Sequence, residues 1–340
     1  MGHTARILDE VRGQIAPSDE TLKAVRERRG DVLDVAKQFP GVLRTYFSGS
    51  VAHGTANDDT DADCGVVLDR RSYPDLGPDV DGPSDVLEKM RVHLRDGLSA
   101  KYPDISFRIT KRAIEVSFKS PLADESDPKV DLIVALTRST GDGLWIPNTK
   151  TDGWDASHPE KHTELLVDKP KSRRVTRARI IRLGKCWNKT FTSPGLISFN
   201  IEALSLESVT EETEVPTGLA EFFEYAGAEL KKRLTPDPAG VSGSIKLLED
   251  RELVVGRLER AGSAVREALD NDDDEDKVRE ALSRVFRGVV QPPADSNSKE
   301  ALAAALTRGN QGVSLVGGTI TVGGTGARAK DTRSYGAAGR

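Results

Sequence analysis

The stretch FSGSVAHGTANDDTDADCGVVLD, residues 47–69, contains the pattern that decides the fold. Gly49-Ser50 follows an apolar pair, and Asp61 and Asp63 come later in the same stretch. Side chains alternate between the two faces of a strand, so a strand here would point both aspartates the same way. A Gly-Ser turn suits a triphosphate, because its backbone N–H groups and its hydroxyl can donate to phosphate oxygens.

A third acid, Asp131, lies within the apolar run VDLIV, residues 130–134, where a buried strand is expected. A lone buried carboxylate costs several kcal/mol unless it is paired or binds a cation. Carboxylate oxygens suit Mg²⁺, which keeps several waters and completes its shell with phosphate oxygens. We therefore expect Asp61, Asp63 and Asp131 to hold two Mg²⁺ ions, with Mn²⁺ as the alternative, in a site for nucleotidyl transfer. The competing interpretation is that these acids lie in a solvated loop. The position of Asp131 within an apolar run disfavours it.

The order of these motifs resembles the DNA polymerase beta-type nucleotidyltransferase superfamily, whose signature is Gly-Ser, a spacer, Asp-x-Asp and a later third acid. Further segments are similar to the CD-NTases, bacterial enzymes related to cyclic GMP-AMP synthase and oligoadenylate synthase. They are GLWIPNTKTDGWDASHPEKHTELL (143–166), RARIIRLGKCWN (177–188) and ISFNIEAL (197–204). The resemblance covers residues 40–205 well. It implies an α+β fold, with a polymerase-beta-like mixed sheet, flanking helices and a C-terminal helical lobe.

The chemistry of such a site suggests a role for each residue of the first motif. Asp61 and Asp63 would bridge the two metals, and Asp131 would complete the shell of the metal that activates the acceptor hydroxyl. Gly49 and Ser50 would hold the β- and γ-phosphates of the donor nucleotide.

The resemblance extends the nucleotide site into the helical lobe. Lys185 would contact the triphosphate, Ser198 would assist it, and Phe199 would stack on the donor base. Spacing alone fits a solvated helix face for Lys185, and it fits a helix N-cap for Ser198. The arginines of the same basic helix fit either an acceptor phosphate or polynucleotide, or a solvated face; they are Arg173, Arg174, Arg177, Arg179 and Arg182.

The length of 340 residues allows two lobes that share a cleft. We expect a catalytic lobe over 1–160, a helical lobe over 161–308 and a flexible glycine-rich tail over 309–340. Expected strands are 42–47, one carrying Asp61 and Asp63, 105–111, 112–118 and 130–136. Expected helices are 3–15, 18–38, 84–100, 171–189, 198–209, 217–234, 244–270, 275–290 and 297–308.

Charge and composition exclude several classes of protein. The net charge of −5 argues against a chain built to coat nucleic acid, and there is no long apolar run. The two cysteines have no zinc-ligand spacing, which argues against a double-stranded DNA sensor of the zinc-containing animal type. With neither a signal peptide nor a transmembrane segment in evidence, the cytoplasm is the expected location.

The resemblance implies synthesis of a cyclic di- or trinucleotide from NTPs with release of pyrophosphate. Such enzymes act in anti-phage signalling, upstream of a nucleotide-activated effector. The same three acids would serve transfer of one nucleotide to RNA, a protein or a small molecule, so this alternative stays open. A catalytically degenerate nucleotide-binding protein is a third interpretation, which the complete motif disfavours.

The tail is a candidate attachment point for another protein. In related systems a ubiquitin-conjugation-like partner joins the carboxyl terminus of the synthase to a target. Residues 309–340 would suit a conjugation or regulatory partner of this kind, although the terminal Arg340 fits poorly to a small-residue end.

Overall fold

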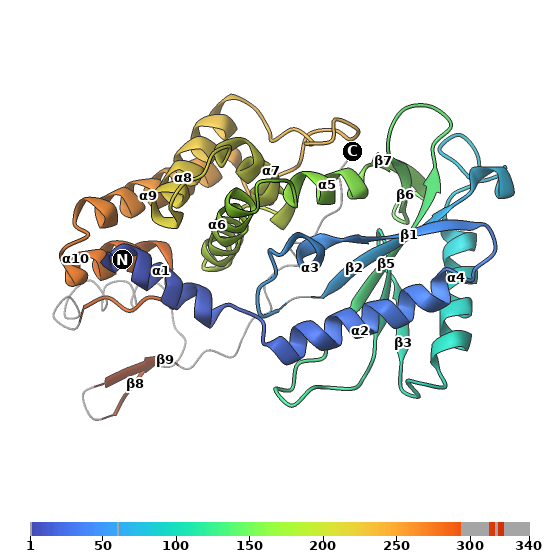
Figure 1. Cartoon of the computed structure of the whole chain (residues 1–340), viewed down its shortest axis with the longest axis horizontal. Helices are drawn as coiled ribbons and strands as arrows, with labels where there is room; N and C mark the ends of the chain where they lie inside the picture. Colours follow the sequence, from blue (N-terminus) through green and yellow to red (C-terminus); the bar gives the residue numbers. More distant parts are fainter. Residues whose placement is uncertain (1, 60, 294–312, 317–318, 323–340) are drawn as a thin grey trace.

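The computed structural model describes residues 2–59, 61–293, 313–316 and 319–322. A lobe built on a β-sheet and a lobe built of helices lie beside one another (Figure 1). The expected mixed α+β architecture with a C-terminal helical lobe is confirmed.

A mixed sheet forms the core of the first lobe. Its strands are β1 (Val42–Ser48), β2 (Ala62–Leu68), β3 (Ser106–Ile109), β4 (Ile114–Ser117), β5 (Val130–Thr137), β6 (Leu144–Asn148) and β7 (Gly153–Ser157). The strand order is β1-β2-β5-β4-β3, with β6 paired to β5 and β7 paired to β6. Only β2 and β5 run parallel among these pairs of described strands, and the others are antiparallel.

Helices α2 (Asp19–Ala36) and α4 (Ser84–Leu98) cover one face of this sheet (Figure 1). Ser18 caps α2, because its hydroxyl accepts a hydrogen bond from the backbone N–H of Thr21 at 3.0 Å. Alternate residues of β2, such as Cys64 and Val66, are buried against these helices. The residues between them therefore point to the opposite face, where Asp63 lies.

The helical lobe contains α5 (Pro159–Leu166), α6 (Lys171–Lys189), α7 (Ser198–Ser208), α8 (Val215–Lys232), α9 (Arg251–Asp270) and α10 (Glu275–Val285). The expected helix at 171–189 has the bounds of α6. Residues 244–250, expected to begin a helix, do not: the N–H groups of Ile245 and Leu248 donate to carbonyl oxygens of neighbouring loops, and Asp250 caps α9.

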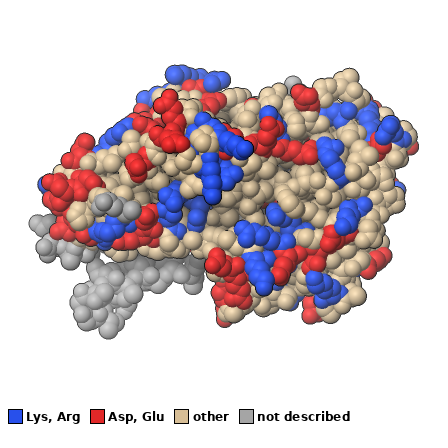
Figure 2. All heavy atoms as spheres, in the orientation of Figure 1, with Lys and Arg blue, Asp and Glu red and all other residues tan. Residues whose placement is uncertain are grey.

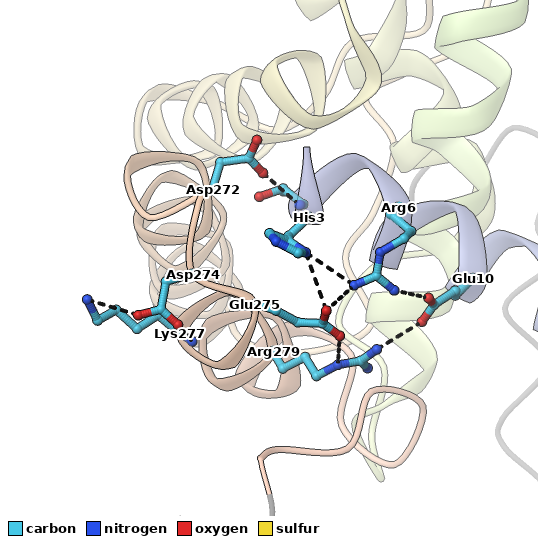
Figure 3. A network of polar contacts seen from close by, with 9 residues as sticks. His3, Arg6, Glu10, Asp272, Asp274, Glu275, Lys277 and Arg279 are labelled. Carbon is cyan, nitrogen blue, oxygen red and sulfur yellow. Dashed lines mark hydrogen bonds and ion pairs between the residues drawn. The ribbon is translucent and has the colours of Figure 1, made fainter. Parts of the chain in front are cut away.

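Helix α1 (His3–Gln14) packs on the helical lobe, although it was expected with the catalytic lobe in 1–160. Its apolar side chains, Ile7, Leu8 and Val11, lie in the core that α6, α8 and α9 also form. Figure 3 shows a polar network that ties α1 to α10, in which Arg6 and Arg279 both pair with Glu275, at 2.6 Å and 2.8 Å. Helix α1, although it is the first in the chain, therefore belongs to the helical lobe.

The expected helix at 297–308 and most of the expected tail at 309–340 lie outside the described residues. Within that tail the structure describes β8 (Val313–Val316) and β9 (Thr319–Val322), which pair antiparallel. Among the described helices, none combines the length and the apolar character that crossing a bilayer requires.

Candidate active site

A row of polar residues crosses the sheet at the end where the Gly-Ser turn lies. Because β2 and β5 are parallel and in register, Asp63 stands directly beside Asp131. Ser48 of β1 continues the row on one side, and Glu115 of β4 continues it on the other. Neighbours paired across strands have their side chains on one face, so Asp63 and Asp131 share the face away from α2 and α4.

Asp61 precedes β2 by one residue and lies at the same end of the sheet. Its Oδ1 accepts a hydrogen bond of 2.9 Å from the backbone N–H of Lys129, just before β5. Asp63 is buried, with 6 % of its surface exposed, and Asp131 is half-buried. The fold therefore brings the three predicted acids to the starts of two adjacent parallel strands.

The Gly-Ser turn lies directly against Asp63. Gly49 begins the short helix α3 (Gly49–His53) with a φ of +71°, a conformation that favours glycine. A Cβ atom placed on Gly49 would lie 1.8 Å from Oδ2 of Asp63. Glycine is thus required twice at this position, for its backbone conformation and for the close approach of the carboxylate.

Gly49→Ala is expected to lower both stability and activity, and Gly54→Ala supplies a matched control. Gly54 has a φ of +73°, but a Cβ there meets nothing within 4 Å. The backbone conformation alone should cost about 1–2 kcal/mol in each variant, measured by urea unfolding. Only Gly49→Ala should also displace Asp63 and reduce turnover, so equal loss of activity in the two variants would contradict the assigned contact.

The donors at this site are oxygen atoms, which suits Mg²⁺ or Mn²⁺. In the part of the chain that the structure describes, no three His, Cys, Asp or Glu side chains enclose a metal ion by themselves. Mg²⁺ does not require such a cage, since it is commonly held by one or two carboxylates together with water and substrate phosphates. Asp61, Asp63 and Asp131 fit that kind of incomplete site.

Lys185 of α6 lies in a buried polar cluster between the lobes. Its Nζ pairs with Oε1 of Glu202 on α7 at 2.7 Å, and it donates to Oγ1 of Thr55 at 3.1 Å. Lys185 is 6 % exposed, and Glu202 is 5 % exposed. The solvated helix face that spacing alone permitted for Lys185 is therefore wrong, whereas its contact with a triphosphate stays a prediction.

Glu202 connects this lysine to the end of the short helix that begins at Gly49. Its Oε1 accepts from the Thr55 hydroxyl at 2.8 Å, and its Oε2 lies 3.3 Å from Nδ1 of His53. His53 is the last residue of α3, and its Nε2 lies 3.1 Å from Oγ1 of Thr163 on α5. Burial disfavours the carboxylate, but the charge of Lys185 and the contact with His53 outweigh it and hold the pKa of Glu202 well below its usual range.

Ser198 and Phe199 lie at the start of α7, and both are half-buried. Ile197, not Ser198, is the N-cap, and Asn200 accepts a hydrogen bond from the Ile197 N–H at 3.2 Å. The Phe199 ring packs against His162, with 4.6 Å between ring centroids. The proposed contacts of Ser198 with phosphate and of Phe199 with a base stay predictions.

His53, Thr55 and Glu202 were not among the site residues predicted from the sequence. A signal was present, because Glu202 interrupts the apolar run IEAL of a helix whose neighbouring positions are buried. A buried acid needs a partner. Its partners come from three separate segments, and local patterns do not reveal which residues will meet.

No protein-family model matches the chain, and no curated protein matches it. Solved structures do match. CdnC of Escherichia coli MS115-1, in complex with HORMA-deltaN, superposes with a TM-score of 0.64 at 17% identity, over 86% of this chain and 98% of that chain. The Bradyrhizobium diazoefficiens CD-NTase CdnG, in complex with GTP, gives 0.60 at 14% identity, over 84% and 96%.

This chain has the CD-NTase fold. The cyclic AMP-GMP synthase DncV of Vibrio cholerae, bound to nonhydrolyzable GTP, agrees, with a TM-score of 0.60 at 14% identity over 82% of this chain and 93% of that chain. These matches extend over both lobes, beyond the segments that carry the sequence motifs. The predicted resemblance is confirmed at the level of the CD-NTase fold.

Proposed function

We propose that this protein is a metal-dependent nucleotidyltransferase that joins NTPs into a cyclic di- or trinucleotide and releases pyrophosphate. The close approach of Gly49 to Asp63 carries the proposal, because it sets a turn that would bind phosphate against an acid that would bind metal. The CD-NTase fold supports it, since DncV, which shares that fold, is a cyclic AMP-GMP synthase.

Each transfer would use groups that the fold already gathers. The backbone N–H groups at Gly49 and the Ser50 hydroxyl would hold the β- and γ-phosphates of the donor. A hydroxyl oxygen of the acceptor ribose would form a bond to the α-phosphorus, the bond to the bridging oxygen would break, and pyrophosphate would leave. Asp131 would accept the hydroxyl proton. A second transfer of the same kind would close a dinucleotide ring.

Asp61, Asp63 and Asp131 would hold the metal ions of this reaction. Two divalent cations, when bound, would stabilise the charge on the attacking and leaving oxygens. Lys185, Ser198 and Phe199 would hold the triphosphate and base of the donor from the helical lobe. For Lys185 this would require release from Glu202 or a shared contact with phosphate, because its ammonium group now pairs with that carboxylate.

Partners follow from the same proposal. The product would activate a downstream effector in anti-phage signalling, and the carboxyl-terminal tail would be a site for a conjugation or regulatory protein. CdnC of E. coli MS115-1 has been solved in complex with HORMA-deltaN, which supports looking for a regulatory protein here.

Incubation of the purified protein with each labelled NTP, singly and in pairs, with Mg²⁺ or Mn²⁺ tests the function. The expected product resists phosphatase and has the mass of a cyclic di- or trinucleotide. A label that appears only on added RNA, protein or a small molecule would instead support single-nucleotide transfer. If no NTP is consumed with either ion, alone or with candidate partners present, the chain is a degenerate nucleotide-binding protein and the proposal fails.

A further inference from the structure

The arginines of α6 separate into two groups in the structure. Arg173, Arg174 and Arg177 donate to backbone carbonyl oxygens around the end of α5 and to Asp168. These three arginines therefore already have hydrogen-bond partners within the helical lobe. Arg179 and Arg182 are three residues apart, so they share another face of α6.

Arg12 of α1 faces Arg179 and Arg182. The two helices pack through one core, in which Val11 and Ile180 lie immediately beside these arginines in the sequence. Burial, and then the neighbouring charge of Arg179, lower the pKa of Arg12. Burial, and then the charge of Arg12, lower the pKa of Arg182. Three guanidinium groups thus converge on one place.

The donors of this arginine cluster, Arg12, Arg179 and Arg182, are incompletely used. Nε of Arg12 and Nη2 of Arg182 are buried, and neither has a hydrogen-bond partner among the described residues. Asp9 pairs with Arg12, and Nε of Arg182 makes a long contact of 3.4 Å with Oδ1 of Asn57. A buried donor without a partner destabilises the protein, so an anion at this place would be stabilised strongly.

The arginine cluster adjoins the loop that leads to the catalytic acids. The side-chain amide of Asn57 donates to the Arg182 carbonyl at 3.3 Å, and the Asp58 N–H donates to the Ile15 carbonyl at 2.9 Å. This loop joins α3 to β2 and carries Asp61. Figure 2 shows Lys and Arg atoms gathered over α6, in the middle of the face toward the viewer.

We propose that Arg12, Arg179 and Arg182 bind the triphosphate of the acceptor nucleotide. The inference rests on the proposed function. A reaction between two NTPs needs two places for polyphosphate, and the Gly49-Ser50 turn supplies the first. The arginine cluster contacts Asn57 in the loop that follows helix α3, and it would supply the second. Arginine suits this task because its planar fork of donors matches phosphate oxygens.

The ligand expected here is a compact polyphosphate rather than a polynucleotide. Proteins that follow a nucleic-acid backbone place exposed Lys and Arg side chains along a groove, often with aromatic residues for the bases. Nε of Arg12 and Nη2 of Arg182 are instead buried, on neighbouring helices. The net charge of −5 shows that the cluster does not simply reflect a basic composition.

Binding of inorganic tripolyphosphate, followed by calorimetry, tests the site without catalysis. Arg182→Gln and Arg179→Gln should each weaken binding at this site at least about tenfold, the loss of one charge-assisted contact. Arg71→Gln is the matched control, because Arg71 is an exposed arginine paired with Asp69 far from the cluster. The variant Ser50→Ala alters only the Gly-Ser turn, so it distinguishes tripolyphosphate binding at that turn from binding at the arginine cluster. Unchanged tripolyphosphate affinity in both cluster variants would overturn the site, whether or not the protein makes product.

A kinetic experiment then tests the assignment to the acceptor. The donor would be a 2′,3′-dideoxy NTP, which lacks an attacking hydroxyl, and the acceptor an α,β-methylene NTP, which cannot donate. Arg182→Gln should raise KM for this acceptor at least about tenfold and leave KM for the donor unchanged. With a nucleoside monophosphate as the acceptor, KM should be the same for Arg182→Gln and for the wild type. An equal rise in KM for both acceptors in Arg182→Gln would contradict the proposal. So would a variant that loses polynucleotide binding but keeps its affinity for tripolyphosphate.

Discussion

Asp61→Asn combined with Asp63→Asn is expected to abolish product formation while the protein stays folded. Asparagine keeps the shape that fits against Gly49 but removes two negative charges from the proposed metal site. Loss of a group that stabilises the transition state typically lowers turnover by about 100-fold or more, and metal ligands act as a unit. The measurement is the rate of product formation in saturating Mg²⁺, together with the melting temperature.

Asp69→Asn is the control for this variant, because Asp69 follows the opposite end of the same strand β2 and caps a short helix, η1 (Arg70–Ser72). It should leave turnover near the wild-type value. Turnover at the wild-type rate in the Asp61/Asp63 variant, with a normal melting temperature, would remove these residues from the active site.

The residues that form the acid row could be found from sequence because their signals are local. Asp-x-Asp at a strand start and a lone acid in the apolar run of β5 each follow from alternation and burial. Their meeting could not be derived in the same way. It depends on β2 and β5 being adjacent, parallel and in register, and that arrangement follows from the packing of the whole sheet.

Element ends were predicted best where the hydrophobic period was long and clear, as in α6. Strands β6 and β7 were missed, because each is short and β6 contains Pro147, which lacks a backbone donor. The location of α1 was also missed. Its apolar stripe predicts a helix with one buried face, but it does not say which lobe that face will contact.

The Lys185–Glu202 pair is an example of a single contact that could not be predicted from the sequence. From sequence, Lys185 was either a solvated cation or a phosphate ligand, and a buried ion pair was not among the alternatives. The partner is close in sequence, yet it belongs to the next helix. Only the packing of α6 on α7 brings the two charges to 2.7 Å.

Lys185→Met is expected to destabilise the protein by about 3–5 kcal/mol, the typical cost of leaving one member of a buried ion pair without its partner. Urea unfolding measures the effect. Adding Glu202→Gln should recover much of the loss, because the remaining buried carboxylate charge is removed. Lys189→Met is the control, since Lys189 lies one turn along α6 in a more exposed pair with Asp59 and should cost about 1 kcal/mol or less.

The pH dependence of the pair has a defined sign. The folded protein lowers the pKa of Glu202, so its stabilising contribution is fully present above the usual carboxyl pKa and is lost as the pH falls through the lowered value. The difference in unfolding free energy between wild type and Glu202→Gln should therefore be constant near neutral pH and shrink in acid. A difference that grew with falling pH would contradict the ionised state of Glu202.

The double variant Lys185→Met/Glu202→Gln also separates the two roles of Lys185. If the lysine only holds the Gly-Ser segment in place, restoring stability should restore the apparent KM for the donor NTP as well. If it also contacts the triphosphate, KM should stay raised by about tenfold or more, because a charge-assisted contact worth about 1.5–3 kcal/mol is still absent. We expect the second result. A donor KM that returns to the wild-type value in a stable double variant would assign Lys185 to the buried pair alone.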